Sequence, residues 1–228
     1  MAFDPPADLL VFDLDGTLID SLADLAAAVN QTLADLDRPP LPLTTVARYV
    51  GDGARMLIRR SLGSQASEAD ADRALERFYR HYGSGLLEET RLYPGAEEAL
   101  KAFARAGKRL AVLTNKPERF SAAIVEGLGC GTRFERIYGG DSFSSKKPDP
   151  EGLRRIISET GAAPERTLMI GDSAVDIRTA RNAGVRSCGV TFGLRPESFE
   201  QEPPDFYANS FAELKDLVLG NSESEPRA

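Results

Sequence analysis

Residues 9–18 read Leu-Leu-Val-Phe-Asp-Leu-Asp-Gly-Thr-Leu, and this stretch decides the fold of the 228-residue chain. Its first four residues form a continuous apolar run, which is typical of a short strand buried on both faces of a parallel sheet. The run stops at Asp13, where a polar turn begins. Because successive side chains of a strand point to opposite faces, Asp13 and Asp15 are expected to project the same way while Leu14 turns inward. The stretch therefore predicts a buried strand that ends in two acids.

Four more apolar runs follow along the chain, at 110–113, 136–138, 167–170 and 186–190. Amphipathic stretches with a helical period alternate with them, at 96–106, 120–128, 150–160 and 173–183. Strands that alternate with helices of this length predict an α/β fold, in which helices cover both faces of a parallel sheet.

One interval breaks this alternation, since from residue 18 to about residue 90 the sequence shows helical periodicity and no strand signal. Such an interval is far too long for a single crossover helix between two neighbouring strands. We therefore predict an all-helical domain at 19–90, inserted into a core formed by 1–18 and 91–220. Residues 221–228 are polar and are predicted to form a flexible, solvated tail.

The composition argues against several classes of protein. Acidic residues outnumber basic ones by 35 to 28, and the formal net charge of −7 disfavours binding to nucleic acid or to an anionic membrane. The N-terminus is acidic and broken by proline, unlike a secretory signal, and no apolar run is long enough to span a bilayer. We therefore expect a cytoplasmic protein with reduced thiols at Cys130 and Cys188. The oligomeric state has no signal in the sequence.

The chain contains a single histidine, His81, and this excludes most zinc hydrolases and Ser-His-Asp enzymes. We interpret His81 itself as a packing or surface residue. Any chemistry must therefore depend on carboxylates, hydroxyls, lysine or arginine.

Polar side chains follow three of the predicted strands at their carboxyl ends: Asp13 and Asp15, Thr114 and Asn115, and Asp172 with Asp176. In open parallel sheets the ligand crevice lies beyond these ends. Carboxylates that converge on one small space repel one another unless a cation joins them. An all-oxygen ligand set suits Mg²⁺, which favours phosphate-bearing substrates. Lys147 lies just before the helix predicted at 150–160 and is placed to give its charge to a phosphoryl oxygen.

These residue types suit phosphoryl transfer to a small metabolite through a covalent aspartyl-phosphate. In that scheme Asp13 attacks phosphorus. Asp15 protonates the departing alkoxide and then takes a proton from the water that hydrolyses the intermediate. Mg²⁺, Thr114 and Lys147 hold the equatorial oxygens, and Asn115 is a further candidate for phosphate binding.

Simpler interpretations stay open at several of these positions. Thr114 could cap the helix that follows it, and Lys147 could be a solvated lysine. Ser173 and Asp176 have capping-box spacing, so Asp176 either has this structural role alone or orients a metal-bound water or Lys147. A non-catalytic phosphoacceptor module of the receiver type would also place Asp, Thr and Lys at a sheet edge. Such a module would need neither Asp15 nor the helical insertion.

Four segments resemble, in order, the motifs of the phosphatase branch of the haloacid-dehalogenase superfamily: Phe12-Asp13-Leu14-Asp15-Gly16-Thr17-Leu18, Leu113-Thr114-Asn115, Lys147-Pro148 and Gly171-Asp172-Ser173-Ala174-Val175-Asp176. The resemblance spans nearly the whole chain. It implies a Mg²⁺-dependent phosphomonoester hydrolase with a Rossmann-like core, in which the helical insertion is a mobile cap. It also implies that Asp13, the backbone carbonyl of Asp15 and Asp172 bind the Mg²⁺ ion.

Within this superfamily the cap segment resembles most that of bacterial phosphoglycolate phosphatases, through Arg48-Tyr49-Val50-Gly51-Asp52-Gly53 and Leu92-Tyr93-Pro94-Gly95. This resemblance implies 2-phosphoglycolate as the substrate. We expect Arg48 or Arg55 to hold the substrate carboxylate, because a guanidinium group matches a carboxylate bidentately. Gly51 and Gly53 are expected to let the cap backbone approach the substrate. Solvated arginines and a plain turn are the simpler alternatives.

The motifs leave other activities of the same superfamily open. These are a sugar-phosphate phosphatase, a pyrophosphatase and a β-phosphoglucomutase, all of which would share Asp13, Asp15, Lys147 and Asp172.

Overall fold

The computed structural model describes residues 5–220, and its centre is a six-stranded parallel sheet in the order β5-β4-β1-β6-β7-β8. The strands are β1 Leu9–Phe12, β4 Arg109–Leu113, β5 Arg136–Tyr138, β6 Thr167–Gly171, β7 Arg186–Val190 and β8 Phe206–Ala208. The α/β fold predicted from the sequence is confirmed. All five predicted runs form strands of this sheet, and β8 at its edge is an addition.

Helices cover both faces of the sheet. The alternating side chains of β1 separate two apolar clusters, with Leu10 and Phe12 in one and Leu9 and Val11 in the other. On the first face pack α5 Ala96–Arg105, α6 Glu118–Gly127 and α9 Phe211–Leu219. On the second face pack α7 Glu151–Thr160 and α8 Ala174–Ala183. Three 3-10 turns complete the core: Gly131–Arg133, Pro164–Arg166 and Pro196–Glu200.

Strand β1 is the most enclosed element of the sheet, since β4 and β6 flank it and all four of its side chains are fully buried. Burying an aliphatic or aromatic side chain of this size stabilises the fold by about 1.5–3 kcal/mol. The strand end is fixed by a ladder bond in which the Asp13 N–H donates to the Ile170 carbonyl at 2.8 Å. The position of Asp13 is therefore set by the core rather than by a loop.

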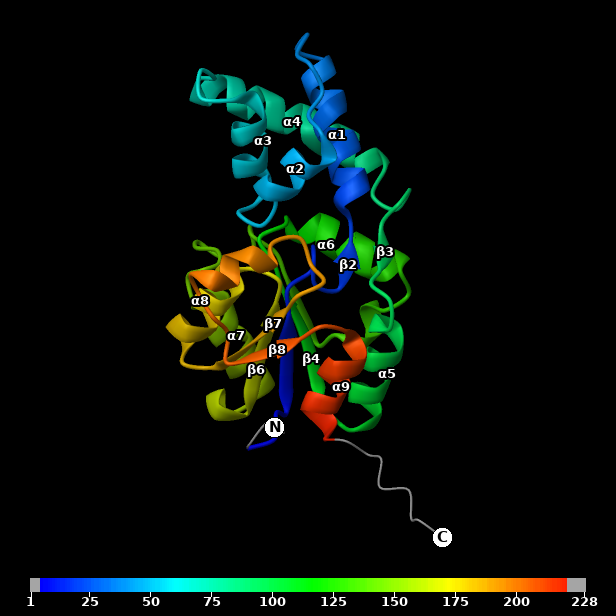
Figure 1. The fold of residues 1–228 in the computed structure, drawn as a ribbon, viewed down its shortest axis with the longest axis vertical. Helices are drawn as coiled ribbons and strands as arrows, with labels where there is room; N and C mark the ends of the chain where they lie inside the picture. The colour runs from blue at the N-terminus through cyan, green and yellow to red at the C-terminus, as the bar shows by residue number, and fades with distance from the viewer. Residues whose placement is uncertain (1–4, 221–228) are drawn as a thin grey trace.

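A helical insertion follows β1 and lies beyond the carboxyl end of the sheet (Figure 1). Its helices are α1 Leu22–Ala34, α2 Leu43–Tyr49, α3 Ala54–Leu62 and α4 Glu68–Ser84. The two linkers pair as a short antiparallel ribbon of β2 Ile19–Asp20 and β3 Arg91–Leu92. The expectation of no strand between 18 and 90 is thus wrong at β2, which forms because the entering and leaving chains lie side by side. The exact domain bounds at 18–19 and 90–91 stay a prediction, and the predicted tail at 221–228 lies outside the described residues.

No helix within residues 5–220 is both long enough and apolar enough to cross a bilayer.

One buried acid ties the first helix of the insertion to the returning linker. Asp24, at the start of α1, accepts hydrogen bonds from the backbone N–H groups of Glu89 and Thr90 and from the Thr90 hydroxyl, at 2.7–3.1 Å. Asp24 is 5% exposed and Thr90 is fully buried. This acid therefore joins the first helix of the insertion to the returning linker, next to the β2–β3 ribbon.

Replacing this acid should loosen the junction. In Asp24→Asn an amide NH₂ group replaces one carboxylate oxygen, and it cannot accept the hydrogen bonds that this oxygen accepts in the wild type. Leaving buried donors unpaired costs about 1–3 kcal/mol. We expect the free energy of unfolding, measured by urea titration, to fall by that amount. The matched control is Asp20→Asn, because Asp20 is exposed and accepts a single 3.2 Å bond from the Leu22 N–H. Equal stabilities of the two variants would contradict the role of Asp24.

Candidate active site

The carboxyl edge of the sheet gathers buried polar side chains from strands that are distant in the sequence. Asp13 follows β1, Thr114 follows β4, and Asp172 follows β6, and each is at most 6% exposed. Asp176, in the first turn of α8, and Lys147, in the segment between β5 and α7, are buried beside them. The structure thus brings together the residues that the sequence placed at this edge.

Three of these acids form a carboxylate cluster, consisting of Asp13, Asp172 and Asp176. One carboxylate oxygen of each lies within 4.8 Å of those of the other two. Lys147 enters the cluster from the side, with its Nζ 2.8 Å from Asp13 Oδ1 and 2.6 Å from Asp176 Oδ1. Three carboxylates therefore share one ammonium group in a space that water hardly reaches.

The charges of the carboxylate cluster do not balance, and the pKa values of Asp13 and Asp172 are raised. Burial raises the pKa of Asp13 to about 6, with the Lys147 ammonium opposing the rise and the Asp176 carboxylate adding to it. Burial together with the charges of Asp176 and Asp13 raises the pKa of Asp172 well above its usual value. Burial disfavours the charged form of Lys147, but Asp13 and Asp176 outweigh it and hold the pKa of this lysine above its ordinary value. Three carboxylates and one ammonium leave a net charge of −2, so the cluster needs two protons or one divalent cation to be neutral.

The cluster fits a divalent metal ion. Asp13 Oδ1 is buried, and its nearest cation among the described residues is the Lys147 ammonium at 2.8 Å, which also bonds Asp176. Asp172 uses Oδ2 to accept the Leu194 N–H at 2.7 Å. An all-carboxylate set is the donor set that hard divalent cations prefer. The buried group can therefore hold a metal.

Asp176 combines the two roles that the sequence left as alternatives. Its Oδ2 accepts the backbone N–H of Ser173 at 3.2 Å and the Ser173 hydroxyl at 2.8 Å, which closes the capping box of α8. Its Oδ1 accepts the Lys147 ammonium. One carboxylate thus starts the helix and also positions the lysine.

Asn115 orients its neighbours with its side chain. Its two amide hydrogens are both used, one on the Gly51 carbonyl and one on the Lys147 carbonyl, each at 3.0 Å. The side-chain amide therefore has no hydrogen left for a phosphate. The neighbouring Thr114 Oγ1 accepts the backbone N–H of Lys116 at 3.3 Å, so its own hydroxyl hydrogen is available to a ligand.

Asp15 lies apart from the carboxylate cluster and has its own partners. Its Oδ1 accepts the Ser21 hydroxyl at 2.5 Å, and the Lys116 ammonium lies 2.8 Å from Oδ1 and 2.9 Å from Oδ2. The Lys116 side chain is 4% exposed and passes over the Tyr82 ring, 4.6 Å from its centroid. Sequence reasoning missed Lys116, although it directly follows the predicted pair Thr114-Asn115.

The insertion touches the core through a cap loop formed by residues 50–53. The carbonyls of Val50, Gly51 and Asp52 accept hydrogen bonds from three core side chains: Arg195 at 3.1 Å, Asn115 at 3.0 Å and Lys146 at 3.0 Å. These donors come from segments after β7, β4 and β5. Lys146 and Arg195 have no role in the sequence-based prediction, because each donates to a backbone carbonyl that is far away along the chain.

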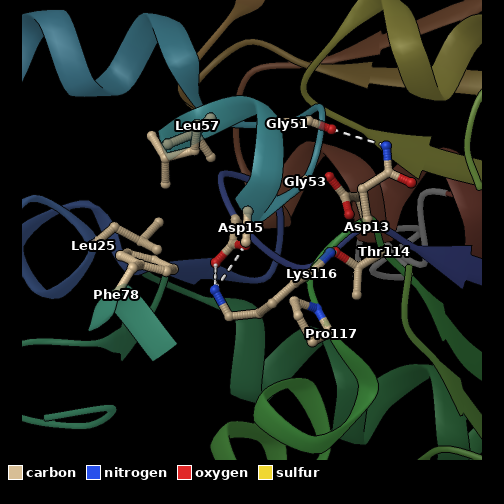
Figure 2. Close-up of a pocket in the computed structure, with 13 residues that line it drawn as sticks. Asp13, Asp15, Leu25, Gly51, Gly53, Leu57, Phe78, Thr114, Lys116 and Pro117 are labelled. Atoms are coloured by element: carbon tan, nitrogen blue, oxygen red, sulfur yellow. Dashed lines mark hydrogen bonds and ion pairs between the residues drawn. The ribbon is translucent and has the colours of Figure 1, made fainter. Parts of the chain in front are cut away.

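A pocket opens between the cap loop and the carboxyl edge of the sheet, and both the insertion and the core line it. Figure 2 shows Asp15 and Lys116 paired beside the apolar side chains of Leu25, Leu57 and Phe78. The full lining is Asp13, Asp15, Leu25, Val50, Gly51, Gly53, Ala54, Leu57, Phe78, Thr114, Asn115, Lys116 and Pro117. A mostly apolar lining with a few convergent polar groups is typical of a site for a small organic ligand.

The two cap arginines and His81 lie outside the pocket lining. Arg55 is paired with Glu68 and Asp72, both at 2.7 Å, on the exposed surface of the insertion. Arg48 is exposed near the end of α2. His81 Nε2 lies 2.8 Å from an oxygen of Asp35. A substrate contact from Arg48 or Arg55 stays a prediction, whereas Gly51 and Gly53 do line the pocket.

A parallel sheet with acids at its carboxyl edge and a helical insertion over them is the architecture of a class of α/β hydrolases. The chain belongs to the haloacid dehalogenase-like hydrolase family, which matches residues 10–190. The phosphoglycolate phosphatase of Agrobacterium fabrum is 40% identical over 213 residues, which cover 92% of this chain and 91% of that protein. The phosphoglycolate phosphatase of Colwellia psychrerythraea is 40% identical over 214 residues, covering 91% and 95%.

Solved structures agree with this assignment. A predicted phosphoglycolate phosphatase from Haemophilus somnus superimposes with a TM-score of 0.87 at 32% identity, covering 93% of this chain and 98% of that one.

Gly53 is the position at which the cap loop comes closest to the core. Its φ is +89°, and a Cβ there would lie 3.2 Å from the Asn115 carbonyl oxygen and 3.1 Å from Lys146 Nζ. We expect Gly53→Ala to push the loop off Asn115 and to weaken the bond to the Gly51 carbonyl. Amides of residues 50–57 should then exchange hydrogen for deuterium faster than in the unsubstituted protein.

Gly63 provides the matched control, because its φ of +79° is similar but a Cβ there would meet nothing within 4 Å. Gly63→Ala carries the same backbone strain of about 1 kcal/mol without the contact. If both variants showed the same exchange at 50–57, the close approach of the loop would have no consequence.

Proposed function

We propose that this protein is a Mg²⁺-dependent phosphatase that hydrolyses 2-phosphoglycolate through an aspartyl-phosphate on Asp13. The observation that supports it most is the buried Asp13 carboxylate, which lies beside the Lys147 ammonium and lines the same pocket as Asp15. Relatives at 40% identity over more than nine-tenths of the chain carry the name phosphoglycolate phosphatase. A cytoplasmic location and a small phosphorylated metabolite as the ligand belong to the same proposal.

Asp13 is the nucleophile in this scheme. One of its oxygens forms a bond to phosphorus while the ester P–O bond breaks, and the alcohol leaves with the electron pair of that bond. The ladder bond to Ile170 holds the Asp13 backbone in place, so the carboxylate can attack in line. The Lys147 ammonium and the Thr114 hydroxyl are near enough to donate to the phosphoryl oxygens.

Asp15 is the general acid and base. It projects into the pocket on the side away from the carboxylate cluster, where the departing oxygen of a substrate bound at Asp13 would lie. In the first step it gives a proton to that oxygen. In the second step it takes a proton from the water that attacks the aspartyl-phosphate, which returns Asp13 and releases inorganic phosphate. Ser21 and Lys116 hold the Asp15 carboxylate in position throughout.

Mg²⁺ would be held by the carboxylates of Asp13 and Asp172 and by the backbone carbonyl of Asp15, with Asp176 and Lys147 next to it. When bound, it supplies positive charge that neutralises the phosphoryl oxygens as the P–O bond breaks. Asp172 itself is fixed by the Leu194 N–H.

Phosphate release tests the proposal directly. With Mg²⁺ the protein should release phosphate from 2-phosphoglycolate faster than from other small phosphate esters, and EDTA should stop the release. Asp13→Asn removes the nucleophile, so turnover should be lost while the folded state remains. Asp15→Asn should lower kcat by about 10²-fold or more, as is usual for the loss of a general acid–base group.

Asp20→Asn is the control for these substitutions, because Asp20 is exposed and lies in the linker strand β2. It should keep the wild-type rate. Near-wild-type turnover by Asp13→Asn would refute the mechanism, and release of no more than one equivalent of phosphate would favour a receiver-type phosphoacceptor.

Mg²⁺ should stabilise the protein in a pH-dependent way. The folded-state pKa of Asp13 is raised to about 6, above an unfolded value of about 3.9, so without metal the ionised site destabilises the fold as the pH rises through 6. Mg²⁺ needs the ionised form, so the gain in Tm on adding Mg²⁺ should be larger at pH 7.5 than at pH 5. Asp172→Asn should lose most of this gain, and Asp20→Asn should keep it. An equal gain in Tm at both pH values would show that Mg²⁺ acts elsewhere.

A further inference from the structure

The pocket has a strongly uneven distribution of charge. All of its lining on the insertion side is apolar or glycine: Leu25, Val50, Gly51, Gly53, Ala54, Leu57 and Phe78. The core side brings two acids, Asp13 and Asp15, and a single cation, Lys116. An anionic leaving group that entered this space would meet only one positive side chain among the described lining residues.

The two cap arginines are placed elsewhere. The Arg55 guanidinium is occupied by two acids of α4, and Arg48 is exposed outside the lining. Lys147 lies on the Asp13 side of the site, where its charge is shared between Asp13 and Asp176. The ammonium of Lys116 is therefore the one that lies next to Asp15, on the leaving-group side.

We propose that Lys116 forms the carboxylate subsite of this enzyme: its ammonium binds the carboxylate of the leaving group and so selects phosphate esters of short hydroxy acids. This inference rests on the proposed function, because it assumes that a phosphoryl group sits at Asp13 with its ester oxygen at Asp15. In 2-phosphoglycolate the carboxylate is attached to the carbon that carries the ester oxygen. When Asp15 contacts this ester oxygen, the substrate carboxylate therefore lies close to the Asp15 carboxyl group. Lys116 is bonded to that same carboxyl.

The hydrogen-bonding capacity of Lys116 allows both contacts at once. An ammonium group has three N–H donors, and the two Asp15 oxygens account for two of them. The third donor lies beside Tyr82, whose hydroxyl accepts no hydrogen bond of good geometry within the described residues, and a substrate carboxylate can compete for this donor. Lys116 is also fixed in the charged state, because Asp15 and Tyr82 outweigh the effect of burial and keep its pKa above the usual value.

The apolar wall strengthens this contact. Leu25, Leu57 and Phe78 exclude water around the ammonium, and an ion pair in a medium of lower dielectric constant is stronger than one in water. The same wall offers a neutral alcohol no hydrogen-bond partner. The pocket therefore discriminates by charge at one point rather than by a network of polar contacts.

The test compares two esters of the same size on one preparation of protein. One is 2-phosphoglycolate, and the other is 2-hydroxyethyl phosphate, whose leaving group carries a neutral hydroxyl in place of the carboxylate. The wild type should prefer 2-phosphoglycolate in kcat/KM. Lys116→Met should reduce that preference by about 10- to 100-fold, mainly through a higher KM for 2-phosphoglycolate, as is usual for a lost hydrogen bond to a charged group.

Lys101→Met is the matched control, because Lys101 lies on α5, its side chain is 42% exposed, and it pairs with Glu97 one turn away. It should keep the wild-type preference. Lys116→Gln gives a second measurement of the same ratio if Lys116→Met is not recovered as folded protein. Because both esters are assayed on the same sample, a reduced fraction of active protein cancels in the ratio.

The outcomes separate the inference from the function on which it rests. A wild type that hydrolyses both esters equally well would overturn the substrate assignment. A wild-type preference that survives Lys116→Met and Lys116→Gln would overturn the subsite while leaving the function intact. A variant that loses kcat equally on both esters, with the preference unchanged, would show that Lys116 only positions Asp15.

Discussion

Four ionisable side chains share one buried space at the carboxyl end of β1, and their charges do not cancel. Asp13, Asp172 and Asp176 face one ammonium, that of Lys147. Burying an unpaired charge costs several kcal/mol, so the surrounding structure must hold these groups together against their repulsion. The strand that carries Asp13 does so with four fully buried side chains between two neighbouring strands. The buried side chains at 9–12 therefore stabilise the fold, and this offsets the unfavourable burial of the acids that follow them.

Three kinds of contact attach the insertion to this core: the linkers, the cap loop, and the packing of Tyr79 and Tyr82 of α4 on Phe120 of α6. At the linkers, the β2–β3 ribbon and the buried Asp24 give a junction with several hydrogen bonds on one carboxylate. At the cap loop, three backbone carbonyls each accept one bond from a core side chain. Single bonds of this kind contribute about 0.5–1.5 kcal/mol each, so the loop contact is weaker than the linker junction. Residues of the cap loop line the pocket, so a movement that widened it there would break these single bonds.

Several parts of the fold could be read from the sequence because their signals are local. The run at 9–12 is apolar without interruption, which marks a strand with both faces covered, and the acids after it fall on the edge where ligands bind. The strands β2 and β3 have only two residues each, and the whole insertion separates them in the sequence. No local sequence pattern therefore predicts their pairing. Strand β8 is a three-residue edge strand whose middle residue, Tyr207, is 51% exposed, and it lacks the buried run that identified the others.

In the site too, residues within local sequence motifs were predicted, whereas residues whose partners are distant in the sequence were not. Asp13, Asp172 and Lys147 stand in recognisable motifs, and Asp176 satisfies both interpretations because its two oxygens act separately. Lys116 and Arg195 were missed because their partners lie 101 and 145 positions away along the chain. Arg55 also has partners that no local pattern indicates, since its guanidinium pairs with Glu68 and Asp72 of a neighbouring helix. A contact between Arg55 and the substrate stays a prediction.

The apolar wall of the pocket connects the insertion to the chemistry without supplying a single reacting group. Leu25, Leu57 and Phe78 are each at most 4% exposed, and they enclose the pair of Asp15 and Lys116. Electrostatic interactions strengthen as water is excluded, so the same side chains that close the pocket also determine how firmly Lys116 holds an acid. A change of packing in the insertion would therefore alter the charge selectivity of the pocket even though every charged group belongs to the core.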